Sequence, residues 1–186
     1  MPLKTVQKTY LYILFTVVCI GILSTSVYYL LGGFKELIIV TAKNNIYSIA
    51  GKDFKGRISN DTIGLYFNEM RNLVETGKMK GDLCLVNYQE EELKDKEVHQ
   101  FIGVLLGEGT TEIPAGLIVK EIECETSFKA ALVMHPLVRP NSEKVQAQLY
   151  EFAQEKGYDL DNYSLEIFYE DNSMIVEMFG IEPNKN

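Results

Sequence analysis

The chain has 186 residues, 46% hydrophobic and 24% charged, which is typical of a folded protein with room for one domain and an appendage. Its formal net charge of −8 repels phosphate backbones, and no basic stripe with interleaved aromatic residues is visible, so we expect no nucleic-acid partner. With two histidines, and three cysteines that show no C-x-x-C spacing, the sequence offers no metal-binding motif. We therefore expect neither a metal nor another cofactor.

The N-terminal segment is far more apolar than the rest of the chain. Residues 9–34 form a run of 26 residues without a charged side chain. A helix of that length reaches about 39 Å, more than the ~30 Å hydrocarbon core of a bilayer. Tyrosines lie near both ends of the run, where their hydroxyls would reach the headgroups: Tyr10, Tyr12, Tyr28 and Tyr29. The sequence therefore predicts an anchor at residues 1–34 and a single-pass membrane protein.

A cleaved signal peptide is the main alternative to this anchor. The small residues Ser24–Ser26 could form a cleavage site. Apolar sequence continues beyond them as far as Leu31, which favours an uncleaved helix. Lys4 and Lys8 precede the helix and weakly favour a cytoplasmic N-terminus. Because this preference is weak, the side of the membrane on which the domain lies is left open.

The remaining sequence divides into a stem, one domain and a short tail. We expect residues 35–44 to form the stem, residues 45–182 the domain and residues 183–186 the tail. The spacing of apolar residues predicts these elements in chain order: a strand at Ile46–Phe54, a helix at Ser59–Thr76, strands at Asp82–Tyr88 and Val98–Leu106, extended runs at Leu117–Thr126 and Phe128–Met134, a helix at Ser142–Lys156, and strands at Tyr163–Glu170 and Ser173–Ile181.

The element order β-α-β-β thus occurs twice. Equivalent positions recur at near-constant spacing: 81 residues from Asn60 to Asn141, 80 from Gly77 to Gly157 and 81 from Tyr88 to Tyr169. Such a recurrence indicates two similar halves that share one core. The predicted fold class is therefore α+β, with two β-α-β-β halves behind one transmembrane helix.

Three segments of the second half resemble a known family. The stretch Phe128–His135, the helix end Glu155–Tyr158 and the strand Leu165–Phe168 resemble the GyrI-like small-molecule-binding domain. This family includes the effector-binding domains of multidrug-sensing and AraC-type transcription activators. The resemblance implies a pseudo-twofold axis between the two halves. The anchored arrangement is also similar to that of an animal receptor for autophagy of the endoplasmic reticulum, whose tail with the autophagy motif has no counterpart here.

The sequence departs from the family pattern at two places that bear on a site. The family's Tyr-Tyr-Asp-x-Pro element is present only as Asn87–Gln89, without the proline. Phe168 stands where the family motif has a tyrosine, which removes one hydroxyl from the implied groove.

Glu166 is the first candidate ligand-binding residue. It lies between Leu165 and Ile167 in an apolar strand, and strand alternation places it on one face with Phe168. The resemblance implies that the matching carboxylate lies in the groove between the halves and faces lipophilic cations. We therefore predict a site with Glu166 as counter-charge and with Phe168 and Tyr88 as walls. The alternative is that Glu166 points into water and that Tyr88 packs in the core.

These features favour a membrane-tethered module that binds an apolar, preferably cationic, small molecule as a sensor or sequestering domain. Some GyrI-like proteins hydrolyse strained electrophilic molecules with a groove glutamate. No nucleophile with its base can be assembled from this sequence, so we predict no catalytic residues and favour binding over an enzyme. A membrane-anchored scaffold without a ligand is the third alternative, and a protein partner is left open, as is the redox state of Cys84 and Cys124.

Overall fold

The computed structural model describes residues 3–107 and 112–181, so the predicted tail at 183–186 lies outside the described residues. The chain divides into two compact units. One comprises the segment up to Glu36 together with Met134–Arg139, and the other comprises the remainder of the chain. The first unit contains helix α1 (Leu3–Leu30) and the short 3-10 helix η1 (Pro136–Val138).

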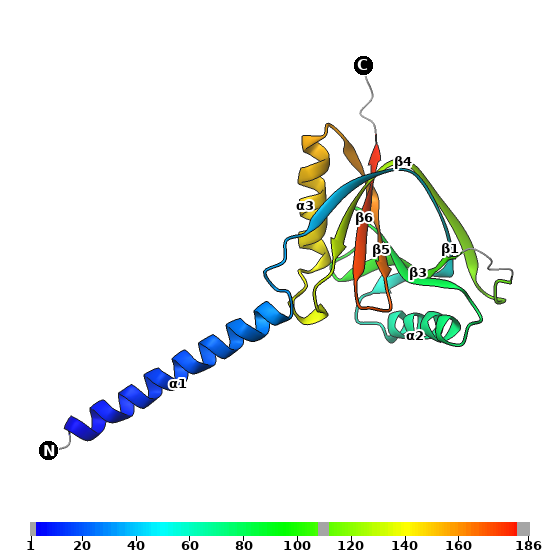
Figure 1. Ribbon diagram of the computed structural model, residues 1–186. Coiled ribbons are helices and arrows are strands. Elements are labelled where there is room, and N and C mark those ends of the chain that lie inside the picture. The colour runs from blue at the N-terminus through cyan, green and yellow to red at the C-terminus, as the bar shows by residue number, and fades with distance from the viewer. Residues whose placement is uncertain (1–2, 108–111, 182–186) are drawn as a thin grey trace. The chain divides into compact units, whose positions relative to one another are not determined.

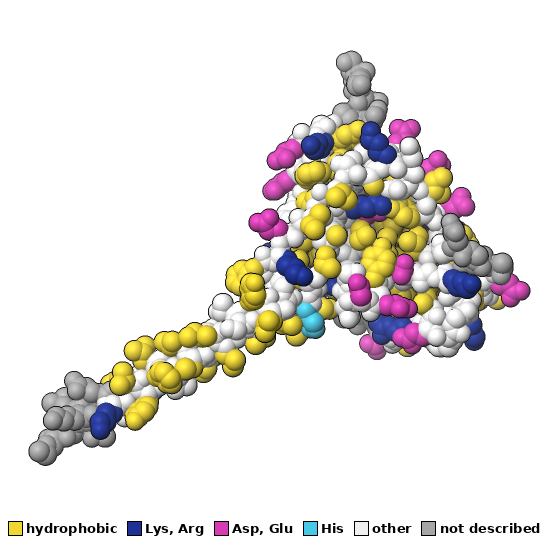
Figure 2. All heavy atoms as spheres, in the orientation of Figure 1, with side chains coloured by type: hydrophobic (Ala, Val, Ile, Leu, Met, Phe, Trp, Pro, Cys, Tyr) yellow, Lys and Arg dark blue, Asp and Glu magenta, His cyan; other side chains and the backbone are white. Residues whose placement is uncertain are grey.

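Helix α1 is long and apolar enough to cross a membrane. Its stretch Lys8–Leu30 has a mean hydropathy of 2.0, and no part of it is buried against the rest of the protein. Among the residues that the structure describes, it is the one helix with this length and composition. Hydrophobic side chains cover the visible length of the helix (Figure 2).

The second unit is a six-stranded antiparallel sheet that closes into a barrel, with two helices packed on its outside (Figure 1). The strands follow one another around the barrel in the order β1-β3-β2-β5-β6-β4. Their bounds, with those of the helices, are β1 (Ile38–Arg57), α2 (Asp61–Glu75), β2 (Gly81–Tyr88), β3 (Glu97–Leu106), β4 (Ile118–Leu132), α3 (Ser142–Glu155), β5 (Asp159–Phe168) and β6 (Met174–Ile181). The chain order is therefore β-α-β-β followed by β-α-β-β; the pseudo-twofold axis stays a prediction.

Both helices begin and end within two residues of the predicted bounds. The side chain of Asn60 accepts a hydrogen bond from the Thr62 amide, and that of Asn141 accepts one from Lys144. These caps satisfy amide groups that the first turn of a helix leaves unpaired. Gly77 and Gly157 follow the two helices with positive φ angles of 69° and 79°, which a residue with a side chain adopts only at a cost.

The first strand differs most from the sequence-based expectation. Residues 38–44, expected as part of a stem, form the beginning of β1, and Ile38–Lys43 pair with β4. The extended runs predicted on either side of Ser127 are one continuous strand, β4. The local pattern does not show this pairing because the two strands lie about 80 residues apart and alternate irregularly between buried and exposed side chains.

Three clusters of buried side chains hold the barrel domain together. One lies under α3 and contains Phe128, Leu149 and Val176, and another lies under α2 and contains Met70 and Ile102. The third draws on all six strands and on no helix, so it fills the interior of the barrel. Its fully or almost fully buried members are Ile49, Cys84, Val86, Phe101, Ile122, Leu165, Ile167 and Phe179.

Truncation of Leu149, which packs α3 against the sheet, should destabilise the domain. Leu149 is fully buried, whereas the neighbouring Tyr150 is 52% exposed. We expect Leu149→Ala to lower the free energy of unfolding by about 2–5 kcal/mol, because it removes buried methyl groups and leaves a cavity. Tyr150→Ala should change it by less than about 0.5 kcal/mol. Urea unfolding of the full chain in detergent, followed by circular dichroism, measures both; equal losses would contradict the packing of α3.

Candidate functional site

Four half-buried tyrosines point into the interior of the barrel. We call the side chains that point into the barrel the inner face. Tyr47, Tyr88, Tyr163 and Tyr169 pack against the fully buried interior cluster yet keep part of their surface accessible. Because these rings point inward and remain partly exposed, solvent reaches this part of the inner face. An accessible surface with several aromatic rings is typical of a small-molecule site.

A fully buried carboxylate lies among these rings. Glu177 of β6 has no exposed surface. The Tyr47 hydroxyl donates to its Oε2 at 2.7 Å, and the Asn45 amide donates to its Oε1 at 3.3 Å. Lys129 Nζ lies 3.6 Å from Oε2 and donates to the Tyr47 oxygen at 2.7 Å. The buried charge is therefore stabilised by hydrogen bonds from two side chains and by one cation.

A second polar network borders Tyr88. His99 lies between two carboxylates, with Nδ1 2.5 Å from Glu90 and Nε2 2.9 Å from Asp53. Lys120 donates to Asp53 at 2.8 Å and to the Tyr88 hydroxyl at 3.2 Å, and its ammonium lies 5.0 Å from the centre of the Tyr88 ring. The His99 ring is 4.5 Å from the same ring. These contacts fix the orientation of Tyr88 on the inner face.

Two tyrosines and one cysteine of the inner face are held in their neutral forms. Burial, with the neighbouring Glu177, raises the pKa of Tyr47 well above its ordinary range. Burial raises the pKa of Tyr163 to about 12. It also raises the pKa of the Cys84 thiol, so the thiolate needed for nucleophilic attack is disfavoured. The two phenols therefore act as hydrogen-bond donors near neutral pH, and none of these groups is an activated nucleophile.

The structure separates the three residues predicted to form the site. Tyr88 lies on the inner face, opposite Tyr163 in the β2–β5 pairing. Glu166 and Phe168 lie on the other face of β5, because alternate residues of a strand point to opposite sides. Tyr88 is therefore not brought together with Glu166 and Phe168.

Glu166 and Phe168 lie on the helix-covered outside of the barrel. Glu166 is 4% exposed and accepts a hydrogen bond from the Asn87 amide at 3.1 Å; Asn87 in turn accepts one from Gln100 at 2.7 Å. The Phe168 ring packs edge-on against Phe67 of α2, with ring centres 5.9 Å apart. Glu166 thus does not point into bulk water, and its role as a counter-charge to a ligand stays a prediction.

Sequence reasoning missed Glu177, Tyr47 and Lys129. Glu177 lies between Val176 and Met178, the same signal of a lone carboxylate in an apolar strand that singled out Glu166. The signal alone does not say which glutamate faces the interior, because that depends on how β4, β5 and β6 pair. Tyr47 and Lys129 become candidates only through their contacts with Glu177.

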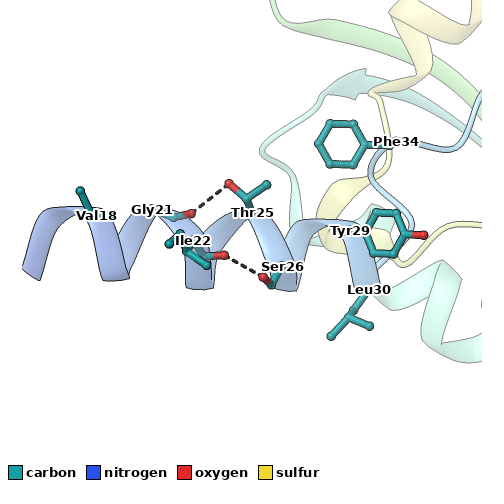
Figure 3. Close-up of a pocket in the computed structure, with 8 residues that line it drawn as sticks. All are labelled: Val18, Gly21, Ile22, Thr25, Ser26, Tyr29, Leu30 and Phe34. Carbon is teal, nitrogen blue, oxygen red and sulfur yellow. Dashed lines mark hydrogen bonds between the residues drawn. The ribbon is translucent and has the colours of Figure 1, made fainter. Parts of the chain in front are cut away.

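A hollow on the surface of α1 lies outside the barrel domain. Its walls are one side of the helix and the ring of Phe34, and it carries no charged group (Figure 3). Two of the three hydroxyls beside it are used within the helix: Thr25 donates to the Gly21 carbonyl at 2.9 Å and Ser26 to the Ile22 carbonyl at 2.8 Å. This surface is therefore suited to lipid tails rather than to a polar ligand.

The described residues contain no cluster of three or more His, Cys, Asp and Glu side chains that could hold a metal ion. Cys84 and Cys124 are free thiols, which answers the question of a disulfide left open by the sequence. Polar chemistry on the inner face therefore comes from hydroxyl, amide, ammonium and carboxylate groups.

Comparison with known proteins identifies the fold and nothing finer. No protein-family model and no curated protein match this sequence. A hydrolase from Listeria innocua matches with a TM-score of 0.52 and 12% identity over 77% of this chain and 91% of that one. EcmrR in complex with DNA matches with a TM-score of 0.51 and 15% identity over 96% of this chain and 72% of that one. The EcmrR C-terminal domain matches with a TM-score of 0.50 and 14% identity over 80% of this chain and 100% of that one. At these identities the similarity shows a shared fold alone.

The network around Asp53 predicts a pH-dependent contribution to stability. Burial raises the pKa of Asp53, but hydrogen bonds from Lys120 and His99 outweigh it and bring the pKa below the ordinary value of 3.8. A lowered pKa in the folded state contributes stability above the unfolded pKa of about 3.9, and this stability is lost as the pH falls through the folded value. Asp53→Asn should therefore destabilise the protein near neutral pH, and its difference from the wild type should shrink in acid.

Asp82 provides a control of opposite sign. Burial and the charge of Glu170 raise the pKa of Asp82, so its charged form is disfavoured in the folded state. Asp82→Asn should leave stability unchanged or increase it near neutral pH, and the difference should vanish below about pH 3.9. Urea unfolding at a series of pH values measures both variants. A loss for Asp53→Asn that is the same at every pH would contradict the ion-pair interpretation.

Proposed function

We propose that this chain is a membrane-tethered domain that binds an apolar, preferably cationic, small molecule on the inner face of its barrel. One observation carries the proposal: the fully buried carboxylate of Glu177 lies among half-buried tyrosine side chains. A carboxylate inside an aromatic surface is costly alone and favourable beside a cation. The ligand class that fits is therefore an aromatic or aliphatic molecule with one positive charge.

The ligand cation is proposed to take the place of Lys129 beside the fully buried Glu177. Lys129 is 3.6 Å from the carboxylate, beyond hydrogen-bond distance, and its ammonium donates to Tyr47 instead. A ligand cation that approaches Glu177 more closely gains the stronger interaction. Residues 35–186 carry 16 basic and 26 acidic side chains, and the resulting charge of −10 attracts cations to the domain.

The side chains of the inner face support binding more directly than catalysis. Both the EcmrR C-terminal domain and a hydrolase from Listeria innocua have a fold similar to that of this chain. On the inner face, Tyr47, Tyr163 and Cys84 all have raised pKa values, and no activated nucleophile accompanies Glu177. The protein is thus proposed to sense or sequester its ligand.

The tether is tested by fractionation. If α1 spans a membrane, the full chain should sediment with membranes and resist extraction by carbonate at high pH, because hydrophobic insertion does not depend on ionic contacts. The mature N-terminus, determined by sequencing, should precede Lys8. A mature N-terminus near Val27 would instead identify the segment as a cleaved signal peptide.

Binding is tested by titration of the full chain in nanodiscs with a quaternary ammonium aromatic compound and its neutral carbon isostere. Glu177→Gln keeps the size and the hydrogen-bond acceptor but removes the charge. It should weaken binding of the cation by about 1–3 kcal/mol, the scale of a charged hydrogen-bonding partner, and should affect the neutral compound much less. Isothermal calorimetry measures both affinities.

Glu166→Gln is the matched control, since it removes the same charge from the outer face of the neighbouring strand. An effect of Glu177→Gln alone supports the inner-face site, and an effect of Glu166→Gln alone would move the site to the sequence-predicted carboxylate. Absence of binding by the wild-type protein would contradict the proposal, and turnover of the compound would favour an enzyme.

A further inference from the structure

The C-terminal end of α1 is closed by a tight reversal of the chain. Gly32 has a φ of 82° and donates to the Tyr29 carbonyl at 3.0 Å, while Gly33 donates to the Tyr28 carbonyl at 2.9 Å. A Cβ atom at Gly33 would lie 2.3 Å from the Tyr28 ring, so a larger residue there would require this ring to move. The reversal brings Phe34 back onto the helix, with its ring centre 5.0 Å from that of Tyr28.

A loop from a distant part of the sequence completes this helix end. We call residues 134–139 the cap loop. The amide of His135 donates to the carbonyl of Leu31 at 3.0 Å, so the loop satisfies one of the carbonyl groups that the last turn of a helix leaves unpaired. The cap loop and the end of α1 belong to the same compact unit and lie side by side (Figure 1).

The cap loop is ordered by its own hydrogen bonds. The Leu137 amide donates to Nδ1 of His135 at 3.3 Å, and the Val138 amide donates to the His135 carbonyl at 3.0 Å. The Arg139 guanidinium donates to the Met134 carbonyl at 3.4 Å. The side chain that this structure presents outward is Leu137, which is 81% exposed.

Leu137 is one of several strongly exposed hydrophobic side chains at this end of the unit. Leu30 is 81% exposed and Phe34 is 63% exposed. A single exposed leucine on a soluble protein needs no explanation. An ordered loop that is hydrogen-bonded to the last turn of an apolar helix is different, because the helix fixes the depth at which the loop lies.

We propose that the cap loop is a second membrane contact, which inserts Leu137 into the lipid interface where α1 leaves the bilayer. The proposal rests on the tether proposed above. If Leu31 lies at the membrane boundary, the hydrogen bond from His135 holds the cap loop at the same level. Leu137 and Phe34 then enter the acyl boundary, and Lys35, which is exposed, reaches the headgroups.

Two separate points of the chain would therefore hold the domain at the membrane. The first is the connection from α1 to β1, and the second is the cap loop between β4 and α3. A domain attached through one flexible connection rotates freely, whereas attachment at two points restricts rotation.

The absence of tryptophan from the sequence allows a direct test. Single-tryptophan variants of the full chain, reconstituted in phosphatidylcholine vesicles, report membrane depth through quenching by lipids brominated on the acyl chain. Leu137→Trp is the test, Leu30→Trp in the anchor is the positive control, and Leu65→Trp on α2, where the side chain is 64% exposed, is the aqueous control. We expect brominated lipid to reduce the emission of the first two variants at least about twofold and to leave the third almost unchanged.

The controls separate this inference from the proposed tether. Quenching at Leu30→Trp without quenching at Leu137→Trp would overturn the second contact and leave the tether intact. Absence of quenching at Leu30→Trp would overturn the tether and the second contact with it. Equal quenching at Leu137→Trp and Leu65→Trp would also overturn the inference, because the cap loop would then be no deeper than any exposed part of the domain.

Discussion

The pairing of β1 on both of its edges is the interaction on which the barrel depends. Ile49–Gly51 pair with β3 on one side and with β4 on the other, so this short segment joins the two halves of the sheet. The backbones approach closely there: a Cβ atom at Gly51 would lie 2.3 Å from the Ile102 carbonyl oxygen. Without this close contact the sheet would have two open edges, and the inner face would not form.

Closure of the sheet decides which polar side chains become partners. Strands have a side-chain period of two, so one residue of register separates the interior from the helix-covered outside. Glu177 and Glu166 belong to adjacent strands and are almost equally buried, yet they face opposite sides. Glu177 has Tyr47 and Asn45 of β1 as hydrogen-bond donors, whereas Glu166 has Asn87 of β2. A buried glutamate therefore has different hydrogen-bond partners on the two faces of the sheet.

The unit that contains α1 is built by another long-range contact. Two glycines that reverse the chain follow α1, but the carbonyl of Leu31 finds its donor at His135, about 100 residues further on. This hydrogen bond makes the loop between β4 and α3 part of the same unit as α1 rather than part of the barrel. The proposed ligand site and the proposed membrane contact thus both depend on β4, which contributes Lys129 to one and leads directly into the other.

The sequence by itself determined the apolar helix, both amphipathic helices and the β-α-β-β order, because these follow from the local spacing of apolar residues. It also identified Tyr88 as an aromatic candidate. Only the tertiary structure showed that residues 38–44 belong to β1 and that Glu177, rather than Glu166, shares a face with Tyr88. The reason is physical: the face of a strand residue and the partner of a buried charge are set by pairing between strands far apart in the chain, and local patterns carry no record of that pairing.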